Sequence, residues 1–179
     1  MSDLEPLPQR TPKRTLPDRL RRASLADAAG GFDGLSELGW LRLTGGGRDA
    51  AALAWDRGML ARVPVGYAWD VVRFSRHEGI QVLRQLRTLG ITIGPVLQQR
   101  SHIKVFVPTG SVDDWDLPGA FVLRHADHVD VPHPAVVSPH SCDGCSWITP
   151  PRNDLALTDG ADLYGAFAAV RATSTYEGR

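Results

Sequence analysis

The fold is decided by the stretch Gly66-Tyr-Ala-Trp-Asp70-Val-Val-Arg-Phe-Ser75-Arg-His-Glu78. Its apolar first part predicts a β-strand, and its last four residues form a capping box, the signature of a helix start. Apolar residues then repeat at helical spacing, at Ile80, Leu83, Leu86 and Leu89. Gly90 supplies a helix stop, and a further apolar run follows at 93–97. This part of the chain therefore predicts a strand, a helix and a second strand.

Other elements are predicted on both sides of this unit. An alanine-rich helix is expected over 50–59, and further strands over 102–107, 120–125, 128–131 and 147–149. A final helix is expected to be capped by Thr158 or Asp159. Because one crossover is followed by consecutive strands, the sequence predicts an α+β fold. We expect a mixed, mainly antiparallel sheet with helices packed on it, within one domain over residues 25–179.

Composition limits the class of protein. The chain has 179 residues, 42% of them apolar, and a net charge of zero, which argues against a protein that coats polyanions. No apolar run approaches the roughly 20 residues of a membrane span, and the N-terminus lacks a signal-peptide pattern, so a cytoplasmic protein without membrane contact is expected. Two of the 20 basic residues are Lys, and the others are Arg. This excess fits a GC-rich codon bias or, alternatively, phosphate binding by guanidinium groups.

The N-terminal residues 1–24 are predicted to form a flexible basic arm. Between positions 10 and 22 there is one acid, Asp18, among six basic residues: Arg10, Lys13, Arg14, Arg19, Arg21 and Arg22. Four prolines between positions 6 and 17 prevent a continuous helix. Such an arm either contacts nucleic acid or serves as a solubilising tail.

The first candidate site consists of Asp70, His102 and Asp130. Each lies in or at the end of a predicted strand. Acids on neighbouring strands can bind a divalent ion such as Mg²⁺ or Mn²⁺, and a histidine can hold a nucleotide phosphate. The alternative is that each is an ordinary polar residue at a strand end.

The order of these motifs resembles the primase–polymerase domain of the archaeo-eukaryotic primase superfamily, and above all its small, degenerate members from GC-rich bacteria. That family has an Asp-x-Asp strand, a helix, a small-residue-x-His strand, and a further acid before an apolar-apolar-Pro-Pro segment. Trp69–Val72 resembles the first motif, Arg100–His102 the second, Val129–Val131 the third and Trp147–Pro151 the last. The resemblance covers residues 62–152.

The resemblance implies the fold and the binding of a nucleotide or single-stranded nucleic acid by a degenerate bacterial regulator. Phosphate contacts are then expected from residues that flank the motif strands: Arg73, Arg100, Ser101 and Lys104. Val72 replaces the second carboxylate of the first motif. Two-metal phosphoryl transfer needs bridging carboxylates, so we expect Asp70, His102 and Asp130 to mark a vestigial pocket without primer synthesis or extension.

The second candidate site is a zinc site between positions 125 and 145. Cys142-Asp-Gly-Cys145 could place two thiolates on one ion, and these are the two cysteines of the chain. Among the nearby histidines, His133 and His140 are the candidate further ligands. The cysteines could instead form a loop disulfide or stay free, and the histidines could be solvated loop residues.

Two other functions compete with nucleotide binding. One is a zinc-stabilised adaptor or regulatory module whose His/Cys segment contacts a protein partner. The other is a surviving one-metal enzyme, a nucleotidyl transferase or nuclease. An open polar pocket favours nucleotide binding or the enzyme, and an occluded apolar one favours the adaptor.

Overall fold

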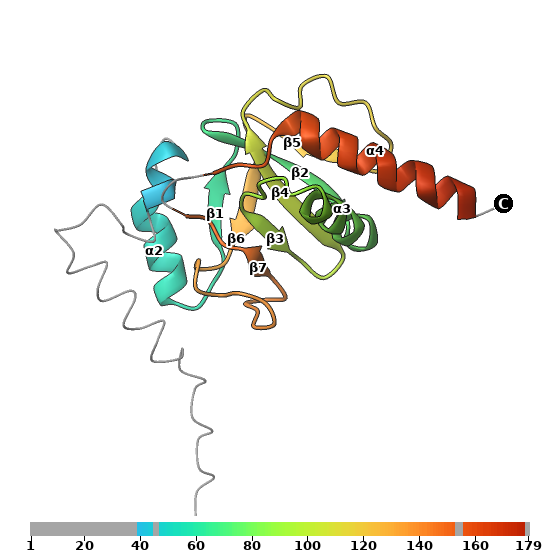
Figure 1. Cartoon of the computed structure of the whole chain (residues 1–179). Helices are drawn as coiled ribbons and strands as arrows, with labels where there is room; N and C mark the ends of the chain where they lie inside the picture. Colours follow the sequence, from blue (N-terminus) through green and yellow to red (C-terminus); the bar gives the residue numbers. More distant parts are fainter. Residues whose placement is uncertain (1–38, 45–46, 153–155, 178–179) are drawn as a thin grey trace, which may run out of the picture.

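The computed structural model describes residues 39–44, 47–152 and 156–177. The predicted basic arm lies outside these residues. Among them, no helix is both long and apolar enough to cross a membrane. The predicted α+β class is confirmed, with helices packed around two antiparallel sheets (Figure 1).

The larger sheet has five strands in the order β5-β2-β4-β3-β7. They are β2 (Trp69–Ser75), β3 (Val96–Gln98), β4 (His102–Pro108), β5 (Phe121–Leu123) and β7 (Ser146–Thr149). All neighbouring strands in this sheet are antiparallel. Strands β2 and β3 therefore run parallel with β4 between them, and α3 (Arg76–Thr88) makes the predicted crossover from one to the other.

The smaller sheet pairs β1 (Ala61–Pro64) with β6 (His128–Val131). Among the described residues, the 3₁₀-helix η1 (Gly39–Thr44) and α2 (Arg48–Asp56) precede β1. The strand predicted at 128–131 thus forms, but it pairs with β1 outside the larger sheet. The last described element is α4 (Gly160–Glu177).

Two hydrophobic cores lie on opposite faces of the larger sheet. On one face, Val72 and Phe74 of β2 pack with side chains from α3 and α4, including Leu86 and Phe167. On the other face, Trp69 packs in the core that η1, α2 and the smaller sheet complete. Figure 1 shows α3 and α4 on one side of the larger sheet, with α2 and β1 on the other. Both faces of β2 are therefore covered over much of its length.

The helix that carries the crossover begins and ends where the sequence predicts. The Ser75 hydroxyl caps the helix by accepting a hydrogen bond from the Glu78 backbone N–H, as in a capping box. The Glu78 carboxylate accepts a hydrogen bond from the Ser75 hydroxyl, where a full capping box would use the Ser75 backbone N–H. At Gly79, an added Cβ would lie 2.5 Å from Ile103, so the missing side chain lets α3 approach β4 closely. Gly90, after the helix, has a φ of 69°, which glycine adopts without strain.

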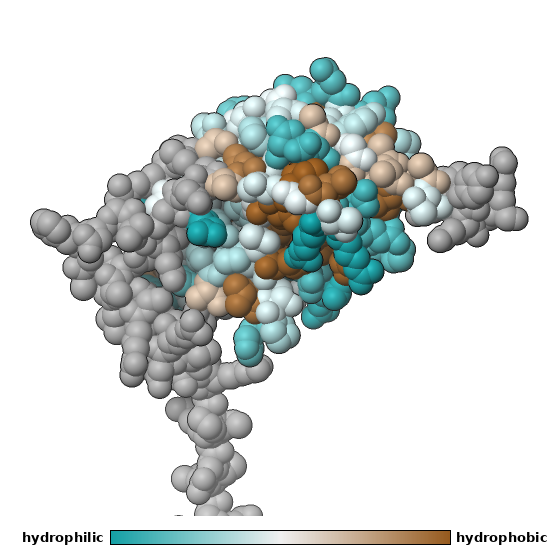
Figure 2. Space-filling model, viewed as in Figure 1, coloured by the Kyte–Doolittle hydropathy of each residue, from teal (hydrophilic) through white to brown (hydrophobic). Residues whose placement is uncertain are grey.

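The last helix is also capped as predicted. The Asp159 carboxylate accepts hydrogen bonds from the backbone N–H groups of Ala161 and Asp162. Leu163 and Phe167 are buried against the sheet. Figure 2 shows the surface on the α3 and α4 side, where hydrophobic residues form small groups among hydrophilic ones.

Candidate functional site

The alternation of side chains along β2 and β4 separates the predicted site residues. In the β2–β4 register, Asp70 lies opposite Val107, Arg73 opposite Lys104, and Ser75 opposite His102. Successive side chains of a strand point to opposite faces. Asp70 therefore shares the α3/α4 face with Val72, whereas Arg73, His102 and Lys104 share the face turned toward the smaller sheet. Asp70 and His102 do not line one pocket, contrary to the expectation from the sequence.

Asp70 has a structural partner in the turn after β4. Its side chain is 2% exposed, and Oδ2 accepts a 2.9 Å hydrogen bond from the backbone N–H of Gly110. Oδ1 is buried with no hydrogen-bond partner among the described residues. Gly110 has a φ of 77°, so the carboxylate fixes a turn that needs glycine. The aspartate that resembles a catalytic residue thus ties the start of β2 to this turn.

We predict that Asp70→Ala lowers the free energy of unfolding by about 1–3 kcal/mol, the cost of leaving a buried donor unsatisfied. Asp70→Asn keeps an acceptor oxygen for Gly110 and should cost less. Urea unfolding followed by circular dichroism measures both. If the two variants were equally stable, the hydrogen bond to Gly110 would not be the role of Asp70.

Asp130 lies near the Lys104 side of the sheet. It belongs to β6, lies opposite Arg62 in the register, and is exposed. Its negative charge acts to raise the pKa of Lys104. The predicted set of Asp70, His102 and Asp130 is therefore divided, with Asp70 on one face of the larger sheet and the other two toward the opposite face.

We call Arg73, His102 and Lys104 the cationic face. Phe121 of β5, Arg73 of β2 and Lys104 of β4 form one row across three adjacent strands, because Arg73 lies opposite both of the others. His102 follows on the next row of the same face, where the backbone N–H of Gln99 donates to its carbonyl oxygen. Three basic residues from two adjacent strands thus lie side by side.

These basic residues are only weakly compensated. Lys104 is 8% exposed, and the Arg73 Nε is buried with no hydrogen-bond partner among the described residues. In the part of the chain that the structure describes, neither residue has a carboxylate within ion-pair distance. Burial lowers the pKa of Lys104, an effect that Cys145 and Asp130 oppose and Arg73 reinforces. Burial, together with the charges of Arg73 and Lys104, lowers the pKa of His102.

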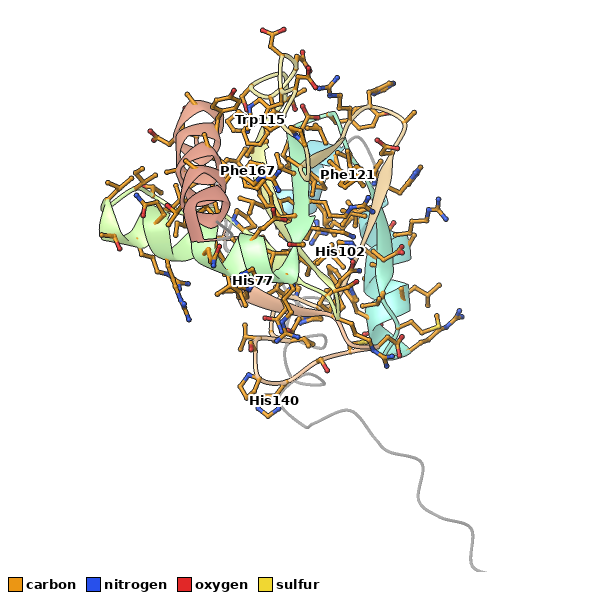
Figure 3. The ribbon with its side chains drawn as sticks, turned by 90° about the vertical axis from the view of Figure 1, so that its right-hand side faces the viewer. His77, His102, Trp115, Phe121, His140 and Phe167 are labelled. Carbon is orange, nitrogen blue, oxygen red and sulfur yellow. The ribbon has the colours of Figure 1, made fainter. Side chains whose placement is uncertain are left out.

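An aromatic ring lies at the end of this row, at the edge of the sheet. Phe121 is 57% exposed, and the Arg73 guanidinium carbon lies 4.7 Å from the centre of its ring. Figure 3 shows Phe121 and His102 on the side of the sheet away from α3 and α4, and Phe167 on the helix side. The cationic face therefore has charged groups along the row and an open aromatic surface at its end.

The other two predicted phosphate contacts lie in the turn before β4. The Ser101 hydroxyl is 2.8 Å from Nδ1 of His102, so these two side chains are hydrogen-bonded partners. Arg100 is exposed and lies against the 142–145 turn, since an added Cβ on Gly144 would be 2.9 Å from its Nε. Ser101 therefore contacts His102, and Arg100 lies against the cysteine turn.

The predicted zinc ligands are not brought together. Cys142 and Cys145 exchange two backbone hydrogen bonds across a turn, but their thiols donate to different carbonyl groups, those of Gly58 and Asp130. Burial raises the pKa of Cys145 to about 11 and also raises that of Cys142. Both pKa values oppose the thiolate form that zinc requires.

The two histidines of the predicted set are also placed apart. His133 packs edge-on against Trp55, and its Nδ1 accepts a hydrogen bond from the backbone N–H of Ala135. His140 is exposed, on the loop marked in Figure 3. Within the described residues, no group of three or more His, Cys, Asp or Glu side chains could hold a metal ion. Zinc binding stays a prediction that elemental analysis can test.

Sequence reasoning missed Phe121 as part of the site. The pairing of β5 with β2 places its ring opposite Arg73, and the sequence does not reveal that pairing. Gln99 was missed for the same reason: its side chain hydrogen-bonds the Cys145 thiol. No local pattern marks either residue, because both positions depend on which strands are neighbours.

Comparisons with known proteins give no family for the chain. No family model matches it, and neither a curated protein nor a solved structure is significantly similar to it.

Proposed function

We propose that the protein binds a nucleotide or single-stranded nucleic acid through the cationic face and that it does not catalyse polymerisation. The observation that carries this proposal is the pairing of Arg73 with Lys104 on adjacent strands, where no carboxylate among the described residues lies within ion-pair distance of either. Like charges directly opposite each other destabilise a sheet. A bound anion would offset that cost.

Phosphate is the anion that fits these groups best. The Arg73 guanidinium can donate two parallel hydrogen bonds to phosphate oxygens, and the Lys104 ammonium adds a compact positive charge. His102, on the next row, can donate a third hydrogen bond from its ring. The three donors come from regular strands of the sheet, so their positions are fixed before a ligand arrives.

Phe121 favours a ligand that carries a base as well as a phosphate. Exposed aromatic rings next to basic groups are the usual platform for single-stranded nucleic acid, since every base can stack on them. The resemblance to primase–polymerase domains supports the same class of ligand.

The orientation of Asp70 supports a binding role over a polymerase role. Asp70 and Val72 point into the helix-side core, away from the cationic face. A second carboxylate at position 72 would also point away. On the cationic side, Asp130 is the acid that acts on Lys104, and one carboxylate leaves a two-metal site incomplete.

A salt titration tests the proposal directly. Fluorescent single-stranded DNA is titrated with the full chain, and a nucleoside triphosphate and inorganic triphosphate serve as competitors. If phosphate contacts dominate, log affinity should fall with log salt by about 0.7 per contact for a single strand. No detectable binding at low salt would contradict the proposal and favour the protein-interaction module instead.

We also predict that Phe121→Ala weakens binding of DNA and of the nucleoside triphosphate by about 1–3 kcal/mol, the value of one stacked base. Binding of inorganic triphosphate should change little, because it has no base. Phe121→Leu, which keeps apolar volume without a π-face, serves as the matched control. Equal weakening for all three ligands would assign Phe121 to the support of Arg73 rather than to stacking.

A further inference from the structure

We propose that Lys104 is an acylation site, which takes the acyl group of an acyl phosphate and thereby controls the cationic face. The phosphate part of the donor would occupy the place of the ligand phosphate, so this inference rests on the proposed function. Acyl phosphates are the donor class that combines a phosphate with a reactive carbonyl group.

The strand register places the Lys104 amine on the same face as the two residues proposed to hold the phosphate. Lys104 lies opposite Arg73 and two residues along β4 from His102, with all three on one face. A phosphate held by Arg73 and His102 would carry its acyl group, through the anhydride oxygen, on the same face of the sheet as the Lys104 amine. Proximity of this kind makes the reaction effectively unimolecular.

The surroundings of Lys104 also favour the nucleophilic form of the amine. The charged or titratable groups that act on it are Arg73 of β2, Asp130 of β6 and Cys145 before β7. Burial, together with Arg73, lowers its pKa against the opposing effects of Cys145 and Asp130. A desolvated lysine beside another cation is a common form of activated amine.

The chemical step needs no further reactant. The Lys104 nitrogen attacks the acyl carbon, and the bond from that carbon to the phosphate oxygen breaks. Inorganic phosphate leaves with the electron pair, and the proton of the amine passes to solvent. The product is a neutral amide, so the cationic face loses one of its positive charges.

The expected consequence is weaker binding of phosphate ligands by the acylated protein. The amide no longer carries the charge that attracts phosphate, while Arg73 and His102 are unchanged. Acylation would therefore lower affinity without unfolding the chain. Lys104→Gln, which is neutral, should bind DNA as weakly as the acylated protein does.

The chain offers an internal control, because its two lysines are Lys104 and Lys13. The full chain is treated with acetyl phosphate, and mass spectrometry of a chymotryptic digest measures acetylation at each lysine. We expect at least about threefold more acetylation at Lys104, equivalent to about 0.7 kcal/mol of activation free energy. In urea the ratio should fall to about one, and Arg73→Gln or added pyrophosphate should lower it in the folded protein.

A neutral acyl donor, the acetyl ester of N-hydroxysuccinimide, distinguishes acylation guided by a phosphate from general reactivity of the Lys104 amine. Preference for Lys104 with acetyl phosphate alone supports a phosphate-guided site. Equal or lower acetylation of Lys104 than of Lys13, with DNA binding intact, overturns the acylation site and leaves the proposed function standing. Preference with both donors, without DNA binding or competition by pyrophosphate, overturns both the phosphate-guided step and the proposed function.

Discussion

Val72→Asp is expected to destabilise the protein strongly and to give no polymerase activity, although it restores the carboxylate pair of the primase-like motif. Val72 is 0% exposed, and its side chain lies on the helix side of the larger sheet with Phe74. A carboxylate there would be buried on the same face as Asp70, among the apolar side chains of the helix-side core. An uncompensated buried charge costs about 3–5 kcal/mol, which is a large part of the stability of a domain of this size.

Chemical unfolding measures the stability of this variant, and incorporation of labelled nucleotides with Mg²⁺ or Mn²⁺ measures its activity. Val72→Ala is the matched control: it removes packing at the same position but buries no charge, so it should be clearly more stable than Val72→Asp. A folded Val72→Asp protein that extends a primer would show that position 72 faces a metal site and would refute the orientation of β2.

The second large effect is expected for the double variant Arg73→Gln/Lys104→Gln. Hydrogen bonds to charged groups are worth about 1.5–3 kcal/mol each, so loss of both should weaken binding of single-stranded DNA at least about 100-fold. Two fewer phosphate contacts should also reduce the slope of log affinity against log salt by about 1.4. Both values come from the same fluorescence titration at several salt concentrations.

Matched controls come from the exposed side of α3. Arg84 and Arg87 belong to that helix and lie on the opposite side of the sheet from the cationic face. Arg84→Gln/Arg87→Gln removes the same net charge and should change affinity far less. Equal losses in the two double variants would mean that binding depends on net charge alone. An unchanged affinity in Arg73→Gln/Lys104→Gln would exclude the cationic face as the site.

The amino-acid sequence determined the local elements of this protein. The capping box at Ser75, the helical repeat after it and the stop at Gly90 are satisfied within a few residues, so they predict α3 correctly. The same holds for α4, where Asp159 caps the first turn and Leu163 and Phe167 share a buried face. Helix caps and helical repeats depend on residues that are close in the sequence, so the sequence alone predicts them.

Which residues belong to the site was decided by tertiary structure, above all by which of the two hydrophobic cores packs on each face of β2. Because both faces of this strand are buried, its residues from Trp69 to Phe74 show no alternation of apolar and polar side chains that would reveal the two faces. Asp70 and Arg73 look equivalent in such a run. Only the packing of α3 and α4 on one face, and the pairing of Arg73 with Lys104 and Phe121 on the other, assigned the first to a structural turn and the second to the cationic face.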